Sequence, residues 1–77
     1  MSIVVATLLE EVYDVVRERS GLTEAQIARM IFGRNGYPQQ VNRACRQLFD
    51  DGRVERRGSG NAGYPYTYYL KLNIRRI

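Results

Sequence analysis

The hydrophobic pattern of this chain changes its period once, near Gly52. Before Gly52, apolar residues recur with the period of about 3.6 residues that is typical of amphipathic helices. After Gly52, apolar and polar residues alternate, which is typical of strands with one buried face. A chain of 77 residues has room for one domain. We therefore expect a single α+β domain over residues 1–77, in which helices come first and strands come last.

The first apolar stripe predicts a helix over Ile3–Arg19. Its buried face would consist of Val5, Leu8, Leu9, Val12 and Val16. Val4 and Val15 widen this face beyond the stripe of about 100° that packing on one core requires. Two interpretations of the extra surface stay open. Either it pairs two copies of the chain along Val4, Leu8 and Val15, or the C-terminal tail covers it.

Capping signals delimit two further helices. Thr23 followed by Gln26 has the pattern of a capping box, so a helix of about ten residues should begin there and end at Gly33. A third helix should start with a proline at its first position and cover about residues 38–51. Gly52 then ends this helix as a residue with positive φ.

The strands are expected over residues 53–57 and 64–72, joined by a glycine-rich loop. The loop sequence GSGNAG matches the glycine spacing of a dinucleotide site, but that motif must open a helix in a βαβ unit. A tyrosine-rich strand follows instead, so we interpret the loop as a hairpin turn whose three glycines take positive φ. In the second strand, Tyr66 and Tyr68 share a face and should pack in the core.

Charge is distributed unevenly along the chain. Residues 1–33 hold three arginines against five carboxylates, which is a net charge of −2. Residues 34–77 hold nine basic side chains against three carboxylates, which is a net charge of +6. A basic half of this kind is typical of proteins that bind a polyanion. The alternative is a basic surface that only keeps the protein in solution.

The chain contains one cysteine and no histidine. An internal disulfide, a zinc finger and histidine-dependent catalysis are therefore excluded. We expect no enzymatic activity, metal or cofactor, because the carboxylates show no pairing suited to acid–base chemistry. Cys45 falls on an apolar helix face, where it should act as a small buried hydrophobe. The N-terminus has no basic leader, and no stretch reaches the roughly 20 apolar residues of a membrane helix, so a cytoplasmic location is expected.

The predicted third helix carries a distinctive polar face opposite its apolar residues. That face consists of Gln39, Gln40, Asn42, Arg43, Arg46 and Gln47. Arginine forks onto O6 and N7 of guanine, and asparagine or glutamine onto N6 and N7 of adenine. A face that only contacts water usually carries Glu and Lys, and this helix contains neither. The face is therefore predicted to read DNA bases, chiefly through Gln39, Gln40 and Arg43 near the helix start.

The order of three helices, a tight link between the second and third, and a hairpin resembles the winged helix-turn-helix family. The resemblance rests on TEAQIARMIFGRNGYPQQVNRACRQLFDDGRVERR and extends over about residues 3–72. It implies that the third helix enters the major groove of double-stranded DNA. It also implies that the wing, residues 57–64, lies on the DNA backbone or in the minor groove. A small transcriptional regulator of the phage, viral, plasmid or archaeal kind is the expected role.

The wing and its base supply further polar residues that should contact DNA. These residues are Arg53, Arg56, Arg57, Ser59, Asn61 and Tyr64. Phosphate contacts from them would position the domain without reading sequence. Because one small domain reads few base pairs, a homodimer on a palindromic site is expected, paired through the first helix.

Two alternatives stay open. Some winged helices bind proteins, so the domain could be an interaction module in a larger complex. The segment PQQVNRACRQL also resembles the subfamily that binds left-handed Z-DNA, because Asn42 and Arg43 match its mid-helix pair. The aromatic residue that this subfamily places later in the helix is Arg46 here, and only Pro65 stands where its wing has two prolines.

Overall fold

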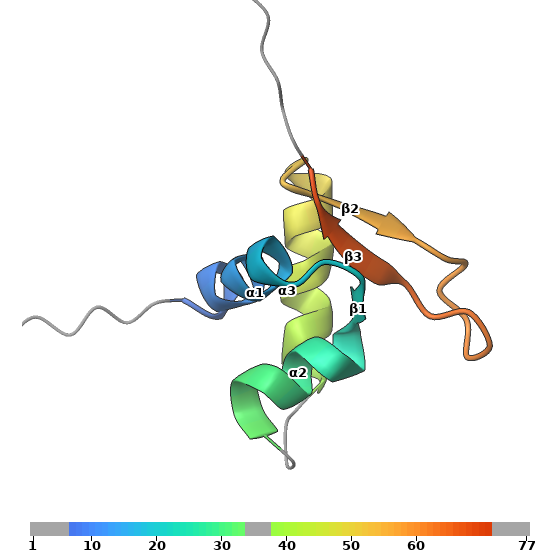
Figure 1. Ribbon diagram of the computed structural model, residues 1–77, viewed down its shortest axis with the longest axis horizontal. Helices are drawn as coiled ribbons and strands as arrows, with labels where there is room; N and C mark the ends of the chain where they lie inside the picture. The colour runs from blue at the N-terminus through green and yellow to red at the C-terminus, as the bar shows by residue number, and fades with distance from the viewer. Residues whose placement is uncertain (1–6, 34–37, 72–77) are drawn as a thin grey trace, which may run out of the picture.

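Three helices precede a β-hairpin in the computed structural model, which describes residues 7–33 and 38–71. The third helix stands at the centre, the first two lie against it, and the hairpin follows from its C-terminal end (Figure 1). The elements are α1 (Leu8–Glu18), β1 (Leu22–Thr23), α2 (Glu24–Phe32), α3 (Pro38–Asp50), β2 (Val54–Arg57) and β3 (Thr67–Leu70). This is the predicted α+β class, with the topology of a winged helix-turn-helix.

Helix α1 begins at a threonine cap rather than in the apolar N-terminal run. Thr7 is extended (φ −63°, ψ 154°), and its hydroxyl accepts a hydrogen bond of 3.3 Å from the amide of Glu10. The carboxylates of Glu10 and Glu11 in the first turn favour this start, because they face the positive end of the helix dipole. The predicted start at Ile3 is therefore wrong, and Val4 lies outside the described residues.

The capping signals of the other two helices are confirmed. Thr23 Oγ1 accepts a hydrogen bond from the Gln26 amide at 3.2 Å, and Gln26 Oε1 accepts one from the Thr23 amide at 2.8 Å. Gly33 closes α2 with φ 78°, and Gly52 follows α3 with φ 76°. Residues with a β-carbon rarely adopt such angles, so Gly52 determines where α3 ends and the strands begin.

The hairpin belongs to a three-stranded antiparallel sheet in which β3 lies between β1 and β2. Tyr68 of β3 pairs with Arg56 of β2 on one side and with Leu22 of β1 on the other. Strand β1 has no signal in the sequence, because two residues are too few to show alternation. Strand β3 is shorter than the predicted 64–72, since residues 64–66 form the return of the wing loop.

The hydrophobic core lies between the three helices and the inner face of the sheet. It consists of Val12, Val16, Ile27, Ala28, Val41, Ala44, Cys45, Leu48, Val54 and Tyr68. All the residues that α3 contributes lie on one side of the helix, so its opposite side faces solvent. Tyr66 packs against the core as predicted, with its ring centre 6.5 Å from that of Tyr68 in an edge-on arrangement.

The buried position of Cys45 yields a prediction about its reactivity. Burial raises the pKa of the Cys45 thiol to about 12, with a smaller contribution from the Glu24 carboxylate. Only the thiolate reacts readily with electrophiles. We predict that native protein at mildly alkaline pH reacts with iodoacetamide no faster than the domain opens, whereas protein in denaturant reacts like an unstructured cysteine. Rapid labelling of the native protein, followed by mass spectrometry, would contradict this burial.

Candidate nucleic-acid interface

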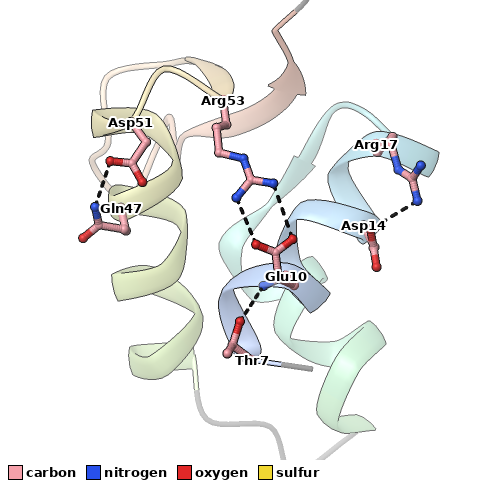
Figure 2. A network of polar contacts seen from close by, with 7 residues as sticks. All are labelled: Thr7, Glu10, Asp14, Arg17, Gln47, Asp51 and Arg53. Atoms are coloured by element: carbon pink, nitrogen blue, oxygen red, sulfur yellow. Dashed lines mark hydrogen bonds and ion pairs between the residues drawn. The ribbon is translucent and has the colours of Figure 1, made fainter. Parts of the chain in front are cut away.

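The outward side of α3 presents all of its predicted base-reading residues to solvent. These exposed residues are Gln39, Gln40, Asn42, Arg43, Arg46 and Gln47. Within the described residues, neither Arg43 nor Arg46 forms an ion pair. Gln47 is partly engaged, because its Nε2 donates a hydrogen bond to Asp51 Oδ1 at 3.0 Å (Figure 2). The helix therefore offers a partner an amide-rich first turn and two exposed guanidinium groups that pair with no carboxylate in the described part of the chain.

A crevice with a volume of about 270 Å³ lies beside this face. It is lined by Thr23, Glu24, Ala25, Asn42, Pro65 and Tyr66. Its walls come from the start of α2, from α3 and from the return of the wing, so an exposed edge of α3 adjoins the wing. The Glu24 carboxylate in this crevice accepts a hydrogen bond of 2.5 Å from the Tyr68 hydroxyl. Because a carboxylate repels phosphate, the crevice itself is poorly suited to hold a DNA backbone.

The wing loop is folded by its own polar groups. The carbonyl of Tyr64 accepts hydrogen bonds from the amides of Ser59 (3.1 Å) and Gly60 (2.8 Å), and from Ser59 Oγ (3.4 Å). Asn61 Oδ1 in turn accepts one from the Tyr64 amide at 2.8 Å. The side chains of Ser59 and Asn61 therefore stabilise the loop itself. Tyr64, whose side chain is mostly exposed (72%), is the aromatic group that the loop presents to solvent.

Two of the three loop glycines confirm the predicted positive φ. Gly58 has φ 106° and Gly60 has φ 82°, whereas Gly63 lies outside this region. A β-carbon at Gly58 would come within 2.6 Å of the carbonyl oxygen of Pro65. Both the backbone angle and the lack of space therefore require glycine at the start of the loop.

Arg53 extends toward α1 and away from the wing. Its guanidinium donates to both carboxylate oxygens of Glu10, at 3.1 and 3.4 Å (Figure 2). It also lies 4.1 Å from the centre of the Tyr13 ring. The hydrogen bond from Arg53 lowers the pKa of Glu10. A phosphate contact by Arg53, as the sequence predicts, would have to replace this ion pair.

Arg56 and Arg57 lie on opposite faces of β2. The guanidinium carbon of Arg56 is on the inner face, 4.0 Å from the centre of the Phe49 ring and 4.1 Å from that of Tyr66. Arg57 is exposed on the outer face, 4.4 Å from the centre of the Tyr69 ring. Among the three arginines predicted around the wing, Arg57 is thus the exposed one, and it has no ion pair within the described residues.

The residues that hold Arg53 and Arg56 in place belong to the site, but the sequence does not indicate them. They are Glu10, Tyr13, Phe49 and Tyr66. Glu10 and Arg53 are 43 positions apart, and no local spacing rule connects residues at such a distance. The tyrosine-rich strand does signal that aromatic rings lie near the hairpin, but it does not say which arginine they contact.

No protein-family model matches the chain, and a search among curated proteins finds no significant match. No helix within residues 7–33 and 38–71 is long and apolar enough to cross a membrane. What the domain binds has therefore to be inferred from its own side chains and their contacts.

The ion pair between Glu10 and Arg53 should make stability depend on pH. The pKa of Glu10 is lowered in the folded protein, so the pair stabilises the fold above the usual carboxylate pKa and stops doing so as pH falls through the lowered value. We predict that Glu10→Gln lowers the melting temperature at neutral pH and that wild type and variant converge in acid. Asp14→Asn, which removes the ion pair between Asp14 and Arg17 on α1, is the matched control. A difference that persists unchanged in acid would contradict a charge effect.

Proposed function

We propose that the domain binds double-stranded DNA as a winged helix-turn-helix protein, with α3 in the major groove and the wing on the backbone or in the minor groove. The observation that carries this proposal is the exposed side of α3. Gln39, Gln40 and Arg43 stand near the helix start, and within the described chain no carboxylate neutralises Arg43 or Arg46. An α-helix fits the major groove, where these side-chain types match the hydrogen-bonding edges of adenine and guanine.

The wing supports the proposal through charge and shape rather than base reading. Arg57 is exposed on β2, and Tyr64 projects from the loop. An exposed guanidinium and a phenolic hydroxyl both donate to phosphate oxygens, and such contacts fix the register of a protein on the duplex. Regulation of transcription in the cytoplasm is the role that we propose for a domain of this kind.

Two arginine substitutions separate base reading from positioning. Arg43→Ala should cost about 1–3 kcal/mol on the preferred duplex and relax the sequence preference. Arg57→Ala should weaken binding to all duplexes about equally and reduce the slope of log K against log salt by about 0.9. Arg17→Ala, on the α1 surface, removes the same charge and should leave binding unchanged. The measurement is selection of sites from random duplexes, followed by titration at several salt concentrations.

Equal weakening of every duplex by Arg43→Ala would overturn the assignment of α3 as the reader. An alternating dC–dG duplex belongs in the same titration, because the resemblance to Z-DNA binders rests on Asn42 and Arg43, which are both exposed on α3. Inversion of the circular dichroism of that duplex on binding would favour the left-handed alternative.

One observation favours the protein-interaction alternative. Met30 and Phe32 at the end of α2 are 49% and 39% exposed, so two large apolar side chains near each other in the chain are open to contact with a protein partner. A module that functions only through such residues would remain folded and bind no duplex at physiological salt. The titration described above therefore distinguishes the two functions.

We further propose that the protein binds DNA as a homodimer paired through α1. The predicted pairing surface consists of Val4, Leu8 and Val15, of which the structure describes Leu8 and Val15. Both side chains pack against the core with one part and are exposed with the other. A two-fold pair would place two α3 helices on a palindromic site.

We predict that Val15→Glu gives a folded monomer in sedimentation equilibrium, with weaker specific binding. A wild-type monomer whose footprint covers a single half-site would exclude the dimer.

A further inference from the structure

We propose that Arg56 is a positioning residue that fixes the wing to the end of α3, and not a phosphate ligand. The inference rests on the proposed DNA binding for its functional meaning and on intramolecular contacts for its geometry. Arg56 stands on β2 between one aromatic side chain from α3 and one from the return of the wing loop. These two rings belong to the two elements that would have to contact DNA together.

The guanidinium of Arg56 lies between two rings at nearly equal distances. Its central carbon is 4.0 Å from the centre of the Phe49 ring and 4.1 Å from the centre of the Tyr66 ring. Both distances lie well within the roughly 6 Å at which a cation over an aromatic face gains energy. Phe49 belongs to the last turn of α3, and Tyr66 directly precedes β3. The three side chains therefore form a stack, Phe49–Arg56–Tyr66, that joins the helix to the wing.

The stack continues from Tyr66 to the tip of the wing. A β-carbon placed on Gly60 would come within 2.5 Å of Cε2 of the Tyr66 ring, so this ring lies directly against the loop backbone. The Gly60 amide donates to the carbonyl of Tyr64 at 2.8 Å, which connects the contact to the exposed aromatic side chain of the loop. Every step from α3 to the tip is therefore a direct packing contact or a hydrogen bond.

The chemistry of arginine explains why this position holds Arg and not Lys. The guanidinium is flat and weakly hydrated, so it can lie between two rings without losing strong hydration. An ammonium group is compact and strongly hydrated, and it has no planar surface to match the rings. Arg57, the next residue, provides an internal comparison, because it is exposed on the outer face and contacts one ring. In the free protein, Arg57→Lys should therefore leave the wing held against α3 as in wild type. Arg56→Lys should weaken the attachment of the wing to α3.

The position of the wing relative to α3 would set which phosphates the wing reaches while α3 occupies the groove. If the stack is lost, the loop is no longer held against the helix, so its internal hydrogen bonds should open more often. The contribution of Tyr64 to DNA binding should then fall, although Tyr64 itself is unchanged. Arg56 would therefore act through the wing, without touching the nucleic acid.

The first test uses the free protein and needs no DNA. Arg56→Lys keeps the charge and removes the planar stack, Phe49→Leu keeps Arg56 and removes one ring, and Arg57→Lys is the matched control. Amide hydrogen exchange of Ser59, Gly60 and Tyr64 should become about two- to thirtyfold faster in the first two variants, which corresponds to the cation–π contribution of about 0.5–2 kcal/mol. Exchange in the middle of α3 should stay slow and shows that each variant is folded. Unchanged wing exchange in both variants would overturn the proposal.

The second test is a double-substitution cycle on duplex DNA. If the wing depends on the stack, Tyr64→Ala should weaken binding by a factor at least about threefold smaller in the Arg56→Lys background than in wild type, as expected for coupled neighbours. If Arg56 were a phosphate ligand, Lys would retain the affinity and the salt dependence, and Tyr64→Ala would have the same effect in both backgrounds. That result would overturn the positioning role. If wild type bound no duplex, the proposed function would fail, and hydrogen exchange alone would decide whether Arg56 holds the wing.

Discussion

The arrangement of the domain depends on Tyr68, which is wholly buried in the central strand of the sheet. Its backbone carbonyl accepts a hydrogen bond from the Gly21 amide at 2.7 Å, and its hydroxyl donates to Glu24 at the start of α2. Burial is the main reason that the pKa of Tyr68 is raised, so the hydroxyl keeps the proton that it donates. The Tyr68 side chain thus joins the sheet to α2, and it belongs to the same core cluster as the buried residues of α3. The orientation of the wing relative to α3 follows from this packing together with the stack at Arg56.

The arginines near the wing differ in what their charge does. Arg53 is neutralised by Glu10, Arg56 lies between two rings, and Arg57 faces solvent on the outer side of the sheet. The net charge of residues 34–77 therefore overstates the number of cationic side chains that are available to bind a polyanion. The arginines on α3 matter more for this reason, since within the described residues Arg43 has no ion pair to break before it meets a base.

Features that depend on neighbouring residues were predictable from the sequence, and features that depend on distant residues were not. The capping box at Thr23, the glycine after α3 and the two-sided character of α3 each arise within one or two helical turns. The predicted start of α1 is wrong because the apolar residues before Thr7 continue the helical pattern in the sequence. Hydrophobic periodicity alone contains no information on which residue caps the helix. Strand β1 exists because β3 is there to pair with it. The partners of Arg53 and Arg56 likewise depend on tertiary packing, which no spacing rule encodes.

The internal hydrogen bonds of the wing loop constrain what the wing can contribute to recognition. Ser59 and Asn61 bond to the backbone of Tyr64, so these polar side chains are engaged before any partner arrives. A loop ordered in advance loses little conformational entropy on binding, which favours affinity. The same engagement removes the groups that would otherwise discriminate base edges, and it leaves a phenol and the nearby Arg57 exposed. In the proposed complex the wing therefore contributes position and affinity, and discrimination between DNA sequences has to come from the exposed side chains of α3.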